Sequence, residues 1–264
     1  MSKPAAAILC LLLAACGTTY QVPIAENTAP TATPAPQRSG GKARAPADFR
    51  RVAARVEPVA EKFCREERGG AGQSCDFAIS LETDPRMPPN AFQTLNEQGR
   101  PIIVVSAALL DQMTSDDEIA FVLSHEASHQ IAQHISKQQQ QSILGAMVMG
   151  GLVVAAGSYG GGASDEAIKQ AMDLGAMAGG RAYSQTYELE ADTLGAFIAA
   201  RSGYDPERGA MLFTSPALAG GGALLSTHPA SAQRVATVAQ VAAEIRRQEA
   251  AGLEPRPTYS QGRF

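Results

Sequence analysis

The sequence SDDEIAFVLSHEASHQIAQHISKQ, residues 115–138, decides the fold. Ser115 followed by Glu118 has the form of a helix capping box, and the acidic first turn favours the start of a helix. Apolar residues then recur on several faces of the expected helix. We therefore predict a helix that continues to about Gln138 and lies buried at the centre of the domain.

This stretch contains His125-Glu126-Ala127-Ser128-His129, the HExxH pattern. Residues four apart on a helix differ by about 40° around its axis, so both imidazoles can bind a single Zn²⁺. Glu126 is offset by about 100° and can reach a metal-bound water without binding the ion. His134 would lie about 180° from His125, so it cannot bind the same ion, and we expect it to be structural or to support a ligand from behind. Two core histidines are the alternative, but their burial beside a carboxylate is costly without a metal.

A catalytic zinc needs a third protein ligand, and acidic residues on a second predicted helix offer one. Glu188 and Asp192 are four residues apart and share a face. One can bind the metal while the other accepts a hydrogen bond from a ligating imidazole. Glu190 points about 200° away from Glu188 and is the weaker candidate. A solvated acidic face is the alternative, and the HExxH pattern upstream argues against it.

Alternating apolar residues predict a strand over 75–83, and a β-branched run predicts a neighbouring strand over 101–105. Prolines between them predict a turn-rich connection at 88–92. These elements predict one α+β domain over 47–250, mostly helical around a small sheet. Helices are expected at about 47–68, 115–138, 183–198 and 231–250.

The N-terminus has the pattern of an export signal. Residues 1–15 carry one lysine and an apolar run that is too short to span a bilayer. Leu-Ala-Ala-Cys16 resembles the bacterial lipobox, in which the cysteine is lipidated, and Gly17 favours the outer membrane. Residues 16–46 are rich in proline and are expected to form a flexible tether. The 264-residue chain has a net charge of −4, so no nucleic-acid partner is expected.

Four cysteines are present, of which Cys10 lies in the signal segment and Cys16 is the lipidation site. The remaining Cys64 and Cys75 form an even pair that suggests one disulfide in an oxidising periplasm. Two buried thiols are the alternative. Without neighbouring histidines, this pair does not make a metal site.

At this point the sequence resembles the CAAX prenyl protease, HtpX and BepA-like metallopeptidases, family 48 of the gluzincins. The resemblance spans about residues 50–245. It rests on Asn90-Ala91-Phe92, the HExxH pattern followed by His134, Glu188-x-x-x-Asp192, and Thr227-His228-Pro229 with Arg234 six residues beyond the histidine. It implies a zincin-like domain that binds one Zn²⁺ per chain and hydrolyses peptide bonds in polypeptide substrates.

Residue roles follow from the same resemblance. It implies that His125, His129 and Glu188 are zinc ligands, with Glu126 as general base. Asp192 and Arg234 would support the ligands, and His228 could occupy the open coordination position as a plug. The chain departs from the family at Gln185, where arginine is usual. The resemblance also implies that the strand at 101–105 is the edge along which substrate lies as an added β-strand, with Asn90, Ala91, Ile102, Ile103 and Val104 as the residues of this substrate edge.

Two further segments carry predictions. Residues 143–162 are apolar and interrupted by glycines. They favour a helical hairpin beside the site or against a partner or membrane, with plain core as the alternative. The C-terminal tail, 251–264, is expected to be frayed. The family points to quality control of misfolded or unassembled envelope proteins by a lipid-anchored periplasmic enzyme. A chaperone or scaffold lipoprotein with a structural or latent zinc site is the alternative.

Overall fold

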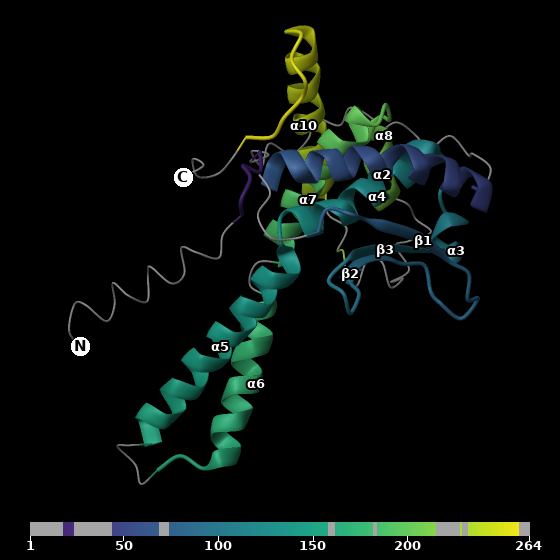
Figure 1. Cartoon of the computed structure of the whole chain (residues 1–264). Coiled ribbons are helices and arrows are strands. Elements are labelled where there is room, and N and C mark those ends of the chain that lie inside the picture. Colours follow the sequence, from purple (N-terminus) through teal and green to yellow (C-terminus); the bar gives the residue numbers. More distant parts are fainter. Residues whose placement is uncertain are drawn as a thin grey trace. The chain divides into compact units, whose positions relative to one another are not determined.

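The computed structural model describes residues 18–23, 44–68, 74–157, 162–181, 184–214, 228 and 232–258 (Figure 1). The signal segment 1–15 and Cys16 lie outside these residues. The chain divides into two compact units. The core unit comprises residues 20–132 and 188–264, and the hairpin unit comprises 133–187 with the segment that ends at Thr19. The division arises because the two helices of the hairpin contact mainly each other.

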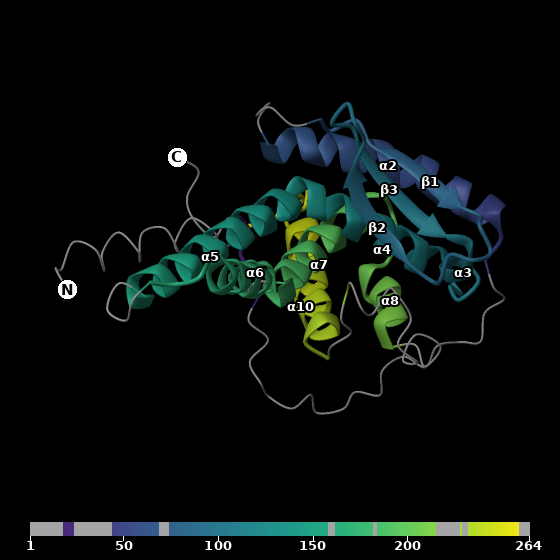
Figure 2. The ribbon, with the colours of Figure 1, turned by 90° about the horizontal axis from the view of Figure 1, so that it is seen from below.

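The core unit contains a three-stranded sheet in the order β1-β3-β2. Its strands are β1 (Ala78–Glu82), β2 (Ala91–Leu95) and β3 (Pro101–Ser106). β1 runs parallel to β3, which confirms that the two predicted strands are neighbours, and β2 runs antiparallel to β3. Helices α2 and α4 contact the sheet, as the ribbon seen from below also shows (Figure 2).

Two predictions about the sheet are wrong. The segment 88–92 is predicted to be a turn-rich connection, but β2 begins within it, immediately after Asn90. The strand can begin there because both prolines, at 88 and 89, precede it. β3 is the central strand, so its backbone groups already pair with β1 and β2. Ile102, Ile103 and Val104 therefore lie on a strand that cannot receive substrate as an added strand. Ala91 lies on the edge strand β2.

The helices of the core unit agree closely with the sequence prediction. α2 (Pro46–Arg68) and α10 (Ala232–Ala250) match the first and last predicted helices within a residue, and α7 (Ser184–Arg201) matches the third. Short elements complete the unit, namely α3 (Ala107–Leu110), α8 (Pro206–Ala210) and η1 (Met211–Thr214). The hydrophobic core of this unit includes the buried side chains of Val52, Val56, Phe63, Ile103, Phe121, Leu194 and Val241.

Helix α4 (Asp116–Ile131) is the centre of the core unit, as predicted. The capping box is formed, with Glu118 N–H donating to the Ser115 hydroxyl. Nearly every residue of α4 is buried. The helix ends at Ile131 instead of continuing to Gln138, because Gln133 adopts a φ of 60° and breaks it. A rotation angle for His134 counted along one continuous helix is therefore meaningless.

The hairpin unit consists of α5 (His134–Gly157) and α6 (Asp165–Arg181). A Cβ on Gly145 would lie 2.0 Å from the carbonyl oxygen of Gly175, so glycine is required for this approach. Within the segment 143–162, residues 143–157 belong to α5 and form a hairpin with α6, and their large apolar side chains are exposed rather than core; residues 158–161 lie outside the described part of the chain. The ring of His134 stacks on the ring of Tyr187, with 4.6 Å between their centroids.

The terminal segments of the core unit are packed where the sequence predicts extended chain. Tyr20 is 2% exposed and its N–H donates to Glu190. Gln21 N–H donates to the carbonyl of Thr258, and Pro255 and Pro257 are buried. The predictions of a free tether over 18–23 and of a frayed tail up to 258 are therefore wrong. A buried aromatic ring and a backbone hydrogen bond hold these segments.

A disulfide joins Cys64, at the end of α2, to Cys75, just before β1. It crosslinks the first helix to the sheet across residues 69–73, which lie outside the described part of the chain. The alternative of two buried thiols does not hold in this structure.

Candidate metal centre

The two histidines of the HExxH pattern lie one turn apart on α4 and converge. The Nε2 atoms of His125 and His129 are 3.1 Å apart. His125 is buried and His129 is half-buried. The central helix therefore presents two imidazole nitrogens to one point, as the spacing predicts.

Helix α7 supplies the carboxylate. Glu188 Oε2 lies 3.3 Å from His125 Nε2, and Oε1 lies 3.5 Å from His129 Nε2. The backbones of α7 and α4 are in contact at Gly195, since a Cβ there would lie only 3.1 Å from the backbone nitrogen of His125. Glycine at this position allows α7 to approach α4 closely enough for Glu188 to reach both imidazoles.

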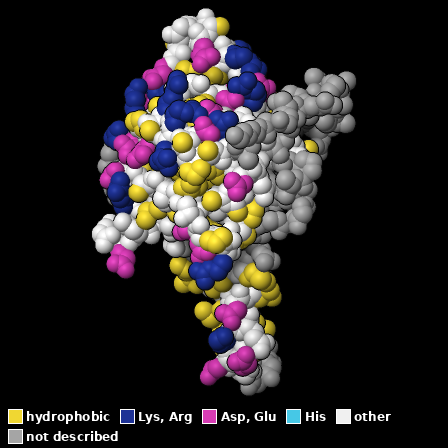
Figure 3. Space-filling model, turned by 90° about the vertical axis from the view of Figure 1, so that its right-hand side faces the viewer, with side chains coloured by type: hydrophobic (Ala, Val, Ile, Leu, Met, Phe, Trp, Pro, Cys, Tyr) yellow, Lys and Arg dark blue, Asp and Glu magenta, His cyan; other side chains and the backbone are white. Residues whose placement is uncertain are grey.

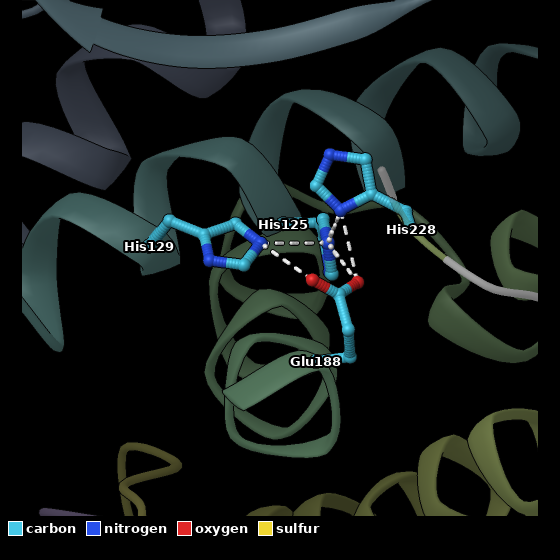
Figure 4. A group of neighbouring side chains, drawn as sticks. All are labelled: His125, His129, Glu188 and His228. Atoms are coloured by element: carbon cyan, nitrogen blue, oxygen red, sulfur yellow. Dashed lines mark hydrogen bonds and ion pairs between the residues drawn. The ribbon is translucent and has the colours of Figure 1, made fainter. Parts of the chain in front are cut away.

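His228 completes the cluster (Figure 4). Its Nδ1 atom lies 2.9 Å from Glu188 Oε2 and 3.3 Å from His125 Nε2. The ring is buried, although Thr227 and Pro229 beside it lie outside the described residues. The structure therefore brings together all four metal-ligand candidates, with their donor atoms within 4.8 Å of one another.

The donor spacing fits a zinc ion. Nitrogen and oxygen ligands about 2.0–2.1 Å from a tetrahedral Zn²⁺ lie about 3.3–3.4 Å from each other. The donor-to-donor distances around Glu188 and His125 fall between 2.9 and 3.5 Å. The donor set of three imidazoles and one carboxylate is also one that zinc prefers.

Glu126 stands beside this cluster without belonging to it. Its side chain is 2% exposed, and Oε1 lies 3.5 Å from His228 Nε2. The carboxylate thus faces the side of the site where His228 sits, which is the position that an attacking water would need.

Asp192 and Arg234 form a buried ion pair behind the ligands. Asp192 Oδ1 lies 2.9 Å from His125 Nδ1, so this imidazole can donate to the carboxylate and turn its Nε2 lone pair toward the metal. Arg234 donates to both Asp192 oxygens, at 2.7 and 2.6 Å, and to the His228 carbonyl at 3.3 Å. One guanidinium therefore supports two ligand-bearing segments.

The charges of the site favour a cation. Burial lowers the pKa of His125, but hydrogen bonds with Asp192 and Glu188 outweigh burial and raise this pKa to about 9. Burial also raises the pKa of Glu188, yet the three histidines hold it well below its usual value. Burial raises the pKa of Asp192, but the ion pair with Arg234 outweighs burial and lowers this pKa below its usual value. Both carboxylates are ionised at neutral pH, and Arg234 pairs with both, at 2.6 Å from Asp192 and 3.3 Å from Glu188.

Two contributors to the site, Phe213 and Gln93, were not identified from the sequence. The ring of Phe213 lies under the Arg234 guanidinium, with its centroid 3.7 Å away, and no local pattern links residues so far apart in the sequence. Gln93 on β2 donates to Gln130, the residue after the ligand His129, at 3.1 Å. Gln185, the position at which the chain departs from the family, is exposed in the first turn of α7. The HExxH spacing alone could not reveal these contacts, because they depend on tertiary packing.

The fold and this site define the class of protein. An HExxH helix, a glutamate ligand from a second helix and a small sheet are the features of a zincin-type metallopeptidase. The model of Peptidase family M48 matches residues 46–242, and the chain belongs to that family, whose members are zinc-dependent.

Curated relatives agree with the family. The chain is 30% identical over 149 residues to mitochondrial metalloendopeptidase OMA1 of Arabidopsis thaliana, and this match covers 52% of this chain and 27% of that protein. It is 30% identical over 172 residues to OMA1 of Saccharomyces cerevisiae, covering 60% and 45%. It is 30% identical over 166 residues to metalloprotease LoiP of Escherichia coli, covering 62% and 61%. The chain therefore matches less than two thirds of each relative.

Proposed function

We propose that this protein is a zinc metalloendopeptidase that hydrolyses peptide bonds in unfolded polypeptides. The observation that carries the proposal is the convergence of His125, His129 and Glu188 beside a buried carboxylate that does not itself join the ligand cluster. The three ligands would hold Zn²⁺. When bound, the ion would polarise the scissile carbonyl and acidify a water molecule.

The residues around the ion would have separate tasks. Glu126 would accept a proton from the attacking water and return it to the leaving amine, as a general base and then a general acid. Asp192 would keep His125 in the tautomer that presents Nε2 to the metal. Arg234 would hold Asp192 in place and would fix the His228 carbonyl.

Substrate would lie along β2. This strand pairs with β3 alone within the described residues, so its other edge has backbone groups that an extended peptide could join. The hydrogen bond from Gln93 to Gln130 ties β2 to the metal-binding helix. Ala91, the first residue of β2, and Asn90, which precedes it, remain in the proposed substrate edge, and β2 takes the place of the central strand β3.

His228 would make the described state a latent one. Its Nδ1 stands at the fourth corner of the ligand set, where a catalytic zinc keeps a water. Movement of His228 out of this position would open the site to water and substrate. The hydrogen bond from Arg234 to the His228 carbonyl would stabilise the closed state.

Four protein ligands also favour the second candidate, a scaffold or chaperone with a structural zinc site, since structural zinc is usually four-coordinate. The two functions differ in activity. A scaffold would bind zinc and hydrolyse nothing, either as wild type or as His228→Ala.

The cellular setting belongs to the proposal. Lipidation of Cys16 would anchor the protein in a bacterial envelope, with the outer membrane favoured by Gly17. The Cys64–Cys75 disulfide suits an oxidising compartment such as the periplasm. The substrates would be misfolded or unassembled envelope proteins.

Metal dependence tests the activity. Purified protein, both wild type and His228→Ala, is incubated with an unfolded, soluble protein such as casein before and after removal of zinc by a chelator. We expect hydrolysis by at least one of them to stop on zinc removal and to return with added Zn²⁺ but not with Mg²⁺. Absence of hydrolysis by both zinc-loaded proteins would reject the peptidase and support the scaffold.

A further inference from the structure

From Ile143 to Gly157, every exposed residue of helix α5 in the hairpin unit is apolar. Ile143, Met147 and Val154 lie within about 40° of one another around the helix and form its apolar face, with 60%, 65% and 48% exposure. Val148 and Leu152 are exposed on other sides of the helix. No charged residue occurs between Lys137 and Asp165. α5 is long and apolar enough to cross a membrane, and only 11% of its most apolar window is buried. Large exposed apolar surfaces of this kind mark sites of association.

The packing of the hairpin explains this exposure. Gly145 and Gly175 bring the two backbones into contact, and Gly179 approaches the backbone of Gln141 in the same way. Because glycines occupy the crossing, the larger side chains of α5 point outward instead of filling the space between the helices.

Helix α6 has a mixed outer surface that, unlike that of α5 beyond Ile143, includes charges. Asp165, Glu166, Lys169 and Asp173 are exposed, and Lys169 pairs with Asp173 at 3.1 Å. The apolar side chains Met172, Leu174 and Met177 of this helix are also exposed. Charged side chains appear among apolar ones on the hairpin in the space-filling view (Figure 3). A hairpin that crossed a bilayer would have to carry α6 back through it, which these charges make costly. The contrast between the helices suits a hairpin that lies in the membrane surface with α5 down and the charges of α6 in water.

The base of the hairpin is close in sequence and in space to the proposed anchor. Lys137 Nζ donates to the Thr19 hydroxyl at 2.9 Å. Thr19 is only three residues after Cys16, so acyl chains on Cys16 would start within about 10 Å of chain from this contact. This step rests on the lipid anchor of the proposed function. It places a bilayer next to the α5 face, which favours a membrane over a second copy of the chain.

We propose that the apolar face of α5 is a membrane-docking surface, which lies in the headgroup region of the bilayer that holds the lipid anchor. The hairpin, residues 133–187, carries three acidic and three basic residues and so has no net charge, so binding depends on apolar burial and does not require anionic lipid. Two weak attachments, one acyl and one helical, would then hold the protein at the bilayer more firmly than either alone.

Vesicle flotation tests the surface without the anchor. The chain from residue 16 with Cys16→Ser is mixed with neutral phosphatidylcholine vesicles, so failure of the lipidation proposal does not affect the result. We expect partial co-flotation that falls at least about tenfold when Ile143→Glu and Met147→Glu are introduced together. The control, Gln138→Glu with Gln170→Glu, adds the same charge at exposed glutamines of the two helices, and Gln138 lies about 140° around α5 from Ile143, so this variant should float like its parent.

Tryptophan depth probes give the orientation, because the chain has no tryptophan of its own. Met147→Trp on α5 should show a blue-shifted emission with vesicles and quenching by brominated lipid, whereas Lys169→Trp on α6 should show neither. Equal quenching at both positions would mean that the hairpin crosses the bilayer, which overturns the proposal. A dimer that forms without lipid and is abolished by Met147→Glu, with no flotation of the parent, would also overturn it.

Discussion

Arg234 offers a quantitative test of how the site is held together. Its side chain is 1% exposed, and Arg234→Met removes two hydrogen bonds to Asp192 and one to the His228 carbonyl. Methionine keeps much of the volume beside Phe213 but leaves the fully buried Asp192 carboxylate without its cation. Breaking a buried ion pair in this way costs about 3–5 kcal/mol. For a domain of this size, each kcal/mol lowers the Tm by roughly 2–4 °C.

We therefore expect Arg234→Met to lower the Tm of the zinc-loaded protein by about 6–20 °C in differential scanning calorimetry. Arg246→Met is the matched control on the same helix. Arg246 is mostly exposed and pairs with the exposed Glu207, so its loss should cost no more than about 1 kcal/mol. A Tm for Arg234→Met within the range of the control would refute the idea that this ion pair supports the site.

Three further predictions concern the ligands and the anchor. His228→Ala should keep zinc, since three ligands remain, and should raise basal proteolysis of casein; unchanged proteolysis with normal zinc would reject latency. Glu188→Gln should weaken zinc binding at least about tenfold in a chelator competition. Glu190→Gln should not, because Glu190 accepts a hydrogen bond from the Tyr20 N–H. Equal weakening in both variants would mean that the ligand is misassigned. Cys16→Ser should move most of the protein from the membrane to the soluble fraction of cells, and unchanged fractionation would reject the lipid anchor.

Local signals made the central helix and its ligands predictable. The Ser115 capping box fixes where α4 starts, and the four-residue spacing of His125 and His129 fixes their common face within that helix. Glu188 needed only the further knowledge that a second helix must supply a ligand. Each of these inferences depends on residues within a few turns of one another.

Tertiary contacts decided the features that the sequence did not reveal. The place of β3 at the centre of the sheet depends on pairing with two separate strands, which strand propensity does not encode. The helix break at Gln133 occurs without the glycine or proline that usually marks one. Tyr20 looked like part of a tether because its burial depends on contacts with distant segments such as Glu190.

Hydrolysis by a Glu126→Gln variant tests the central claim most directly. The variant is prepared zinc-loaded in both the wild-type and the His228→Ala backgrounds, so that a latent site does not hide the effect. Because Glu126 stands outside the ligand cluster, we expect one zinc per chain to remain while casein hydrolysis falls by roughly 10²–10⁴ in the background that is active. Hydrolysis by Glu126→Gln at the rate of its parent, with zinc bound, would contradict the account.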